Sequence, residues 1–211
     1  LVTEHAVTLL DVRSDTVTKP TAAMRRAMAD AEVGDDVLDG DPTTRRLEAV
    51  VAERLGKERA LFFPSGSMAN QAAIWVQSTP GSEILLDADA HIVHWEIAAT
   101  AALCGVQVRP IRGATSVFRA ADLTAGLRAP SIHAVEPSMV CVENTHNGAG
   151  GAVTALHDLR ALSDVARGQQ LPVHLDGARL WNAAVATGTS LAEFAACSDT
   201  VMVSFSKGLG A

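Results

Sequence analysis

The stretch PVHLDGARLWNAAVATG (172–188) contains a short apolar run, a polar turn and an alanine-rich segment. The apolar run 172–176 predicts a buried strand, and 178–187 predicts a helix. The same alternation recurs along the chain, with further strands expected at 60–64, 83–87, 106–111, 139–144 and 200–206, and further helices at 41–56, 65–77, 93–105 and 155–168. Near-continuous apolar strands separated by helices are typical of a parallel sheet covered on both faces. We therefore predict an α/β fold, a three-layer sandwich around a mostly parallel sheet.

Composition narrows the class of protein. The chain has 211 residues, 48% of them hydrophobic and 19% charged, which is enough for one sizeable core. A net charge of −7 without a basic stripe argues against a nucleic-acid partner. The longest apolar stretch, 97–106, is about half of a bilayer crossing, so no membrane partner is expected. The N-terminus lacks signal-peptide features, and Cys104, Cys141 and Cys197 stand singly in apolar segments, which predicts a cytoplasmic protein with reduced core thiols and no metal site.

The candidates for chemistry are the residues that follow each expected strand, because ligands of parallel sheets bind at the carboxyl ends of the strands. After 60–64, a serine–glycine turn leads into a helix at Gly66 and Ser67. The free backbone N–H groups and the positive dipole end of such a helix suit a phosphate. The alternative is an ordinary serine N-cap with no ligand.

Three further strand-end residues each have a functional and a structural interpretation. Asp176 either caps the next helix or holds a heterocyclic nitrogen protonated. Arg179 offers a planar fork for a carboxylate, or forms a salt bridge with a nearby acid. His91 is either a satisfied core or surface histidine, or a flat ring that stacks on an aromatic cofactor and exchanges protons near neutral pH.

Lys207 gives the sharpest signal, because a lysine is rare at the end of an apolar strand, where its ammonium group would be desolvated. That cost becomes useful when a neutral amine must form a Schiff base with a carbonyl cofactor. Gly208 and Gly210 leave room around such a bond. A phosphate cradle, a carboxylate for a ring nitrogen, a stacking imidazole and an imine-forming lysine together indicate pyridoxal 5'-phosphate (PLP).

At this point the chain resembles a known family, the L-threonine aldolases. These are PLP enzymes of the aspartate-aminotransferase fold (fold type I), in the aromatic amino acid beta-eliminating lyase/threonine aldolase group. The resemblance covers almost the whole chain. It rests on RSDTVTKPT (13–21), VGDDV (33–37), PSGSMANQ (64–71), ADAH (88–91), ENTHN (143–147), HLDGAR (174–179) and SFSKGLGA (204–211).

The resemblance implies a role for each matching residue. Lys207, His91, Asp176 and His133 would be catalytic. The cofactor would be bound by Gly66, Ser67, Met68, His91, Asp176, Arg179, Ser204 and Lys207. Ser14, Arg179 and His133 would bind the substrate, the first two through its carboxylate. The implied reaction is retro-aldol cleavage of threonine, allo-threonine or a related β-hydroxy-α-amino acid to glycine and an aldehyde, with His91, His133 or a water as the base.

Two alternatives remain open, a PLP-dependent β-eliminating lyase and a non-catalytic PLP-binding fragment. The resemblance implies a homo-oligomer, a dimer or tetramer, with 31–42 contributing across an interface. It also implies an N-terminal arm at 1–40 and a PLP-binding large domain at 41–211, incomplete at its C-terminus and without the small C-terminal domain of family members. Leu38 and Trp95 depart from the family pattern and predict good activity on β-phenylserine, because they add apolar surface to the substrate pocket.

Overall fold

The computed structural model describes residues 10–113, 115 and 117–211. Two compact units divide the chain. One contains the described part of 1–31 together with Phe205–Ala211, and the other contains the described part of Glu32–Ser204. The unit of 1–31 and 205–211 joins segments from both ends of the chain, whereas the sequence predicts a boundary at residue 40. The boundary at 40 stays a prediction.

The first unit holds a short 3-10 helix, η1 (Asp15–Val17), and helix α1 (Ala22–Ala29). The side chain of Ser14 caps η1 by accepting the Thr16 backbone N–H. The Thr18 hydroxyl donates to the backbone carbonyl of Lys207 at 2.6 Å. The predicted substrate residue Ser14 and the predicted imine lysine therefore belong to the same unit.

The second unit is built on one five-stranded sheet in which every pairing is parallel. Its strands are β1 (Glu83–Asp87), β2 (Gln107–Ile111), β3 (Pro137–Glu143), β4 (Val173–Gly177) and β5 (Thr200–Val203), in the order β2-β1-β3-β4-β5. The strand order reverses after β2, because β3 is added on the other side of β1. Such a reversal is a topological switch point, where open α/β sheets bind ligands. The predicted parallel sheet is confirmed.

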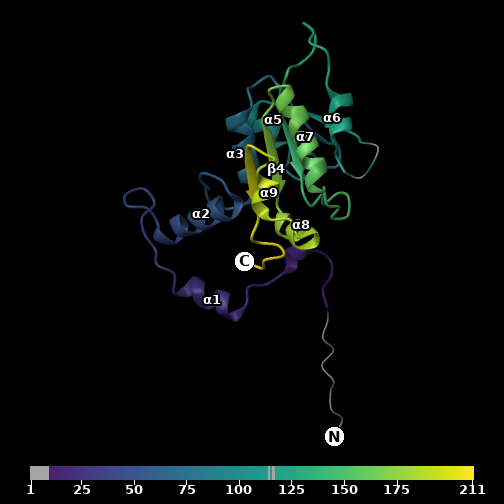
Figure 1. The fold of residues 1–211 in the computed structure, drawn as a ribbon. Helices are drawn as coiled ribbons and strands as arrows, with labels where there is room; N and C mark the ends of the chain where they lie inside the picture. Colours follow the sequence, from purple (N-terminus) through teal and green to yellow (C-terminus); the bar gives the residue numbers. More distant parts are fainter. Residues whose placement is uncertain (1–9, 114, 116) are drawn as a thin grey trace. The chain divides into compact units, whose positions relative to one another are not determined.

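Helices cover both faces of this sheet (Figure 1). The helices described in this unit are α2 (Pro42–Leu55), α3 (Gly66–Gln77), α4 (His91–His94), α5 (Ala99–Cys104), α6 (Ala120–Gly126), α7 (Leu156–Gly168), α8 (Leu180–Thr187) and α9 (Leu191–Ala195). On one face α3 and α5 bury Ile74 and Cys104 against Ile84, Leu86 and Met139 of the sheet. On the other face α6 packs against α7. The three layers agree with the predicted sandwich.

Local sequence signals place some elements accurately. Helix α2 follows its N-cap Asp41, whose side chain accepts the Thr44 N–H at 2.6 Å. It ends at Gly56, which adopts φ +60°, a conformation that glycine tolerates without cost. Both ends of α2 are as the sequence predicts.

Two expectations are wrong. The run 60–64 forms no strand: Leu61 and Phe62 are exposed, and the Phe62 N–H donates to the Glu48 side chain of α2. The expected helix 93–105 is divided into α4 and α5 around Ile97 and Ala98, which adopt φ +55° and +54°. Positive φ is costly for a β-branched residue, so tertiary interactions must impose this break.

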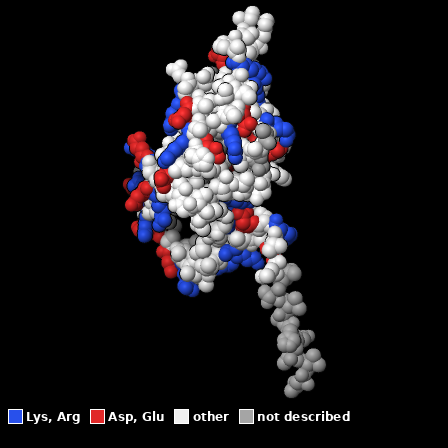
Figure 2. All heavy atoms as spheres, turned by 45° about the vertical axis from the view of Figure 1, so that its right-hand side comes forward, with Lys and Arg blue, Asp and Glu red and all other residues white. Residues whose placement is uncertain are grey.

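The surface is mixed in charge. On the face shown in Figure 2, basic and acidic side chains are interspersed. Among the described residues, no helix combines the length and apolar character needed to cross a bilayer.

Candidate active site

The candidate site lies at the carboxyl ends of β3, β4 and β5. Strand register aligns Glu143 with Asp176, and Cys141 with His174. Because side chains alternate along a strand, His174 and Asp176 point to the same face, and both hydrogen-bond to Asn70 of α3. The sheet therefore places His174 and Asp176 next to the first turns of α3.

Asp176 is 2% exposed and receives two named hydrogen bonds. Its Oδ2 accepts from the Asn70 side-chain amide at 2.8 Å, and its Oδ1 accepts from the Ala178 N–H at 3.1 Å. Burial and the nearby charge of Glu143 raise the pKa of Asp176, although these hydrogen bonds oppose the shift. A buried carboxylate with a raised pKa gains most from a cationic partner, which is what a protonated heterocyclic nitrogen supplies.

Glu96 is the second buried acid of the site, 3% exposed, and it lies in the break between α4 and α5. Its Oε1 accepts from the Asn70 amide at 2.8 Å and is 2.9 Å from His91 Nδ1, while Oε2 accepts from Gln71 Nε2 at 2.6 Å. These bonds explain why the chain breaks there, because a continuous helix would not be free to place Glu96 among these partners. The hydrogen bond to Glu96 raises the pKa of His91.

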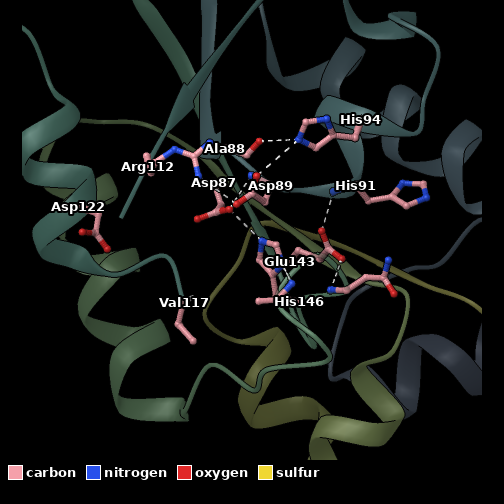
Figure 3. A network of polar contacts seen from close by, with 12 residues as sticks. Asp87, Ala88, Asp89, His91, His94, Arg112, Val117, Asp122, Glu143 and His146 are labelled. Atoms are coloured by element: carbon pink, nitrogen blue, oxygen red, sulfur yellow. Dashed lines mark hydrogen bonds and ion pairs between the residues drawn. The ribbon is translucent and has the colours of Figure 1, made fainter. Parts of the chain in front are cut away.

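Glu143 orders the backbone beside the site. Its Oε2 accepts the His91 N–H at 2.7 Å, and its Oε1 accepts the Asn147 N–H at 2.8 Å (Figure 3). The first bond holds the start of α4, and hence the His91 ring, against the end of β3. Glu143 is thus a positioning group for the predicted stacking histidine.

A smaller polar cluster lies next to this one at the end of β1 (Figure 3). His146 Nε2 and Asp87 Oδ1 are 3.1 Å apart, and His146 Nδ1 accepts the Ala149 N–H at 3.1 Å. Because Nδ1 is an acceptor, Nε2 carries the proton and donates to Asp87. Burial opposes the ionisation of Asp87. With the hydrogen bond from His146, the pKa of Asp87 is nevertheless lowered overall. Both residues line a cavity of about 130 Å³ together with Asp89 and Arg112.

The predicted phosphate cradle is the start of α3. Ser65, and not Ser67, is the N-cap, and its hydroxyl accepts the Met68 N–H at 3.2 Å. For the N–H groups of Gly66 and Ser67, the described part of the chain offers no recorded acceptor, as is usual for a first helical turn. The serine N-cap is therefore confirmed at Ser65, and phosphate binding by the next two N–H groups stays a prediction.

The other predicted residues are distributed as follows. Arg179 immediately precedes α8, and the backbone carbonyl of Ser204 accepts from Trp181 Nε1 at 3.1 Å. Lys207 and Ser14 lie in the first unit. Asp176 and His91 are brought together with Glu96, since one ligand-type atom from each lies within 4.8 Å of the others.

That trio has the composition of a metal site. Its members are also linked by hydrogen bonds, since His91 contacts Glu96 and both acids accept from the Asn70 amide. We therefore interpret this trio as a hydrogen-bonded network.

The predicted role of His133 in catalysis and substrate binding stays a prediction. His133 lines a separate cavity of about 780 Å³ with Ser82, Pro137 and Leu171, which lie at the amino ends of the strands. Strand β3 separates this edge from Glu143, and its seven residues span about 20 Å. The histidine precedes β3, so its position in the chain puts it at the opposite edge.

The sequence analysis did not identify Asn70, Glu96 or His174 as site residues. Asn70 and His174 stand inside motifs that were recognised, SMANQ and HLDGAR, but they read as ordinary members of a helix and a strand. Both residues put a polar side chain on the buried face of a helix or strand. This signal could have identified them.

Known proteins are similar to this chain in sequence and in fold. The model of the beta-eliminating lyase family matches residues 11–211. The probable low-specificity L-threonine aldolase 2 of Arabidopsis thaliana is 40% identical over 215 residues, which cover 100% of this chain and 61% of that protein. The alanine racemase TOXG of Cochliobolus carbonum is 40% identical over 205 residues, 95% of this chain and 52% of that one. The chain thus spans half to three fifths of these relatives' lengths.

Solved structures share the fold. A Listeria monocytogenes protein described as a candidate L-allo-threonine aldolase superposes with a TM-score of 0.73 at 29% identity, covering 92% of this chain and 54% of its own. The serine palmitoyltransferase of Sphingomonas wittichii has a TM-score of 0.61 at 22% identity and covers 88% of this chain and 45% of its own, which supports the fold. The resemblance to the threonine aldolases and to PLP enzymes of fold type I is confirmed, and the chain belongs to the beta-eliminating lyase family.

Proposed function

We propose that the protein uses PLP to cleave a β-hydroxy-α-amino acid, such as threonine or allo-threonine, to glycine and an aldehyde. The observation that carries this proposal is the buried Asp176 at the carboxyl edge of the sheet, held by Asn70 and flanked by His91. Relatives named as L-threonine aldolases support the reaction, and the fold they share supports the cofactor.

The residues of the second unit fit PLP in three respects. Asp176 would pair with the ring nitrogen, and that pairing offsets the cost of the buried carboxylate. The N–H groups of Gly66 and Ser67 would bind the phosphate at the start of α3, next to Met68, whose own N–H is held by the Ser65 cap. His91 would stack on the ring, because Glu96 and Glu143 fix both its side chain and its backbone. When bound, PLP supplies an electron sink for the pair released by Cα–Cβ cleavage.

Lys207 would hold the cofactor covalently. It follows Val203, the last residue of β5, by four positions, and four residues span at most about 14 Å. Chain continuity alone therefore keeps Lys207 within reach of this edge. Ser14 and Arg179 would hold the substrate carboxylate, as the family resemblance implies, and Ser204 would contribute to the cofactor pocket.

His91 is the candidate base for the β-hydroxyl proton. Its Nδ1 faces Glu96, so Nε2 is the atom left to take up a proton. The carboxylate of Glu96 would stabilise the imidazolium that forms, because it lies 2.9 Å from Nδ1.

The direct test is to load the purified protein with PLP, reduce it with borohydride and map the modified peptide. We expect the label on Lys207, and glycine plus an aldehyde as products from threonine. A label on another lysine, or no label on protein that binds PLP, would refute the assignment of Lys207.

β-Elimination is the second candidate reaction, because the family model carries that description. Elimination would release a keto acid and ammonia instead of glycine and an aldehyde, so product analysis separates the two. A relative named as an alanine racemase adds a third outcome, inversion at Cα without cleavage. A chain that binds PLP and yields none of these products would be a non-catalytic fragment.

We also propose that the protein is a cytoplasmic homo-oligomer, a dimer or tetramer, in which 31–42 contributes to an interface. The three free, buried cysteines suit a reducing compartment. Leu38 in that segment is 79% exposed in the single chain. Light scattering of the active protein tests this proposal, and an active monomer would contradict it.

A further inference from the structure

We propose that Thr200, His174 and Asn70 form a one-way chain of hydrogen bonds that orients Asp176 toward the ring nitrogen of the cofactor. Asn70 and His174 would then be positioning residues for the reaction. This inference rests on the proposed binding of PLP. It adds a claim about residues that touch neither substrate nor cofactor, and it follows from a complete assignment of donors and acceptors.

The direction of the chain is set first at Asn70, which is fully buried. Its Nδ2 lies 2.8 Å from Glu96 Oε1 and 2.8 Å from Asp176 Oδ2. Two carboxylate oxygens can only accept, so both amide hydrogens are used there. A flipped amide would aim its oxygen at two acids. The side-chain oxygen of Asn70 must therefore face the remaining neighbour, His174.

His174 is consequently the donor in its contact with Asn70. Its Nε2 lies 3.0 Å from Asn70 Oδ1, so Nε2 carries the proton. His174 is 1% exposed, and this burial lowers its pKa to about 4, although the charges of Asp176 and Glu96 oppose the shift. The ring is neutral at physiological pH, and its Nδ1 must be an acceptor.

Thr200 and Gln77 complete the chain. The Thr200 hydroxyl is 2.8 Å from His174 Nδ1 and donates its single proton there. Its oxygen accepts from Gln77 Nε2 at 2.6 Å, and the other hydrogen of that amide goes to the Ala73 carbonyl at 3.0 Å. Each proton in the series from Gln77 to Asp176 thus has one assigned acceptor.

This arrangement acts on Asp176 in two ways. It delivers a fixed N–H to Oδ2, which favours the ionised carboxylate, and it prevents Asn70 from turning its oxygen toward the acid. With Oδ1 held by Ala178 on the other side, the plane of the carboxylate is fixed. A fixed, ionised carboxylate is what a protonated ring nitrogen requires.

The test compares PLP with a carbocyclic analogue in which a C–H replaces the ring nitrogen while the aldehyde and phosphate remain. Dissociation constants for both are measured by fluorescence on wild-type protein and on variants whose fold is checked by circular dichroism. The analogue cannot pair with Asp176, so the ratio of the two constants reports only on the ring nitrogen. The wild type should prefer PLP, and Asp176→Asn should abolish the preference.

We expect Asn70→Ala to reduce this preference by about tenfold to a hundredfold, the range for a lost hydrogen bond to a charged group. His174→Leu removes a hydrogen bond to a neutral amide oxygen and should reduce the preference by about threefold to tenfold. His174→Gln is the matched control, because its amide N–H can replace Nε2–H, and it should keep most of the preference. If His174→Leu does not fold, Thr200→Val, which removes one partly buried hydroxyl, should still reduce the preference severalfold.

The outcomes separate the two proposals. A preference that is unchanged in the folded Asn70 and Thr200 variants, or an equal loss of affinity for PLP and the analogue, would overturn the positioning role. A wild-type protein that binds PLP without preference over the analogue would also overturn it while leaving cofactor binding in place. A wild-type protein that binds neither ligand would overturn the proposed function itself.

Discussion

The two edges of the sheet both bury acids, but they treat them differently. At the amino edge, Glu83 is fully buried and lies 2.7 Å from Arg109 Nη1, so its charge is paired within the fold. At the carboxyl edge, the named partners of Asp176 are the Asn70 amide and the Ala178 backbone N–H, and those of Glu96 are amide and imidazole groups. The first arrangement pairs an acid with a cation, whereas the named partners of Asp176 are neutral hydrogen-bond donors.

This difference supports the proposed site at the carboxyl edge better than cavity size does. The cavity at the amino edge is about 780 Å³ and the one at the end of β1 about 130 Å³, yet the larger cavity holds only His133 of the predicted site residues. Ionisable groups with perturbed pKa values gather near the carboxyl edge, in buried Asp176 and half-buried His91, with His174 two residues earlier in β4. Electrostatics, and not volume, distinguishes the two edges.

The largest expected effect comes from replacing Asp176. Asp176→Ala should lower kcat for threonine cleavage by about a hundredfold to a thousandfold, because a preorganised charge opposite the ring nitrogen is lost. Steady-state kinetics on PLP-saturated protein measure this. Turnover near the wild-type value with PLP bound would show that the ring nitrogen is not paired with Asp176.

The same residue should have the opposite effect on the stability of the protein without PLP. Its folded pKa is raised, so its favourable contribution is present below the unfolded pKa of about 3.9 and is lost as pH rises through the folded value. At pH 8 we therefore expect Asp176→Asn to leave the thermal midpoint unchanged or raise it by a few degrees. A clear drop in the midpoint would place Asp176 among the structural acids.

A substitution at the amino edge should lower the stability of the protein and leave its activity unchanged. Glu83→Gln removes one partner of a buried ion pair and leaves Arg109, whose side chain is 15% exposed, without its counter-charge. Such losses cost about 3–5 kcal/mol of unfolding free energy. Urea denaturation measures this, and kcat per folded molecule should stay at the wild-type value. A stable but inactive Glu83 variant would break the distinction between the edges.

A smaller effect is expected in the titration of His91. Because the hydrogen bond to Glu96 raises its pKa, this pairing stabilises the fold fully below an ordinary imidazole pKa of about 6.5 and is lost as pH rises through the raised value. Glu96→Gln should lower the pKa of His91, as measured by NMR titration. A short peptide spanning 88–98 gives the reference value. A pKa that does not change on substitution would contradict the assigned partner.

The smallest effect concerns the substrate side chain. Leu38 and Trp95 are 79% and 66% exposed in the single chain and are available to line a pocket. We expect activity on β-phenylserine at least comparable to that on threonine. Leu38→Tyr should shift kcat/KM toward threonine by about fivefold, the equivalent of one hydrogen bond of about 1 kcal/mol. Leu38→Phe, which adds a ring without the hydroxyl, is the control and should not produce this shift.

Much of the fold follows from sequence because its signals are local. All five strands of the sheet lie within three residues of their expected bounds, and Asp41 and Gly56 bound α2 as expected. The sequence does not predict the break in the helix at Ile97. An alanine-rich apolar run gives no sign that Glu96 binds Asn70 and Gln71 of another helix. The run 60–64 was misread because apolar content alone does not ensure that a segment finds a partner strand.

The candidate site, like the fold, is predicted only in part by the sequence. Strand-end reasoning placed Asp176 and His91 at the carboxyl edge, where the structure has them, since topology alone carries such residues there. The family resemblance gives His133 a role but not the end of the strand at which it lies, and the structure has it at the amino edge. Asn70 and His174 required knowledge of which side chains meet across α3 and β4, and that is a tertiary property.

The central claim is that the carboxyl edge of the sheet holds PLP. A crystal structure of the protein grown with PLP tests it most directly. The account predicts the ring nitrogen within hydrogen-bonding distance of an Asp176 carboxylate oxygen and the phosphate at the N–H groups of Gly66 and Ser67. PLP bound in the amino-edge cavity beside His133, or at the carboxyl edge with its ring nitrogen away from Asp176, would contradict the account.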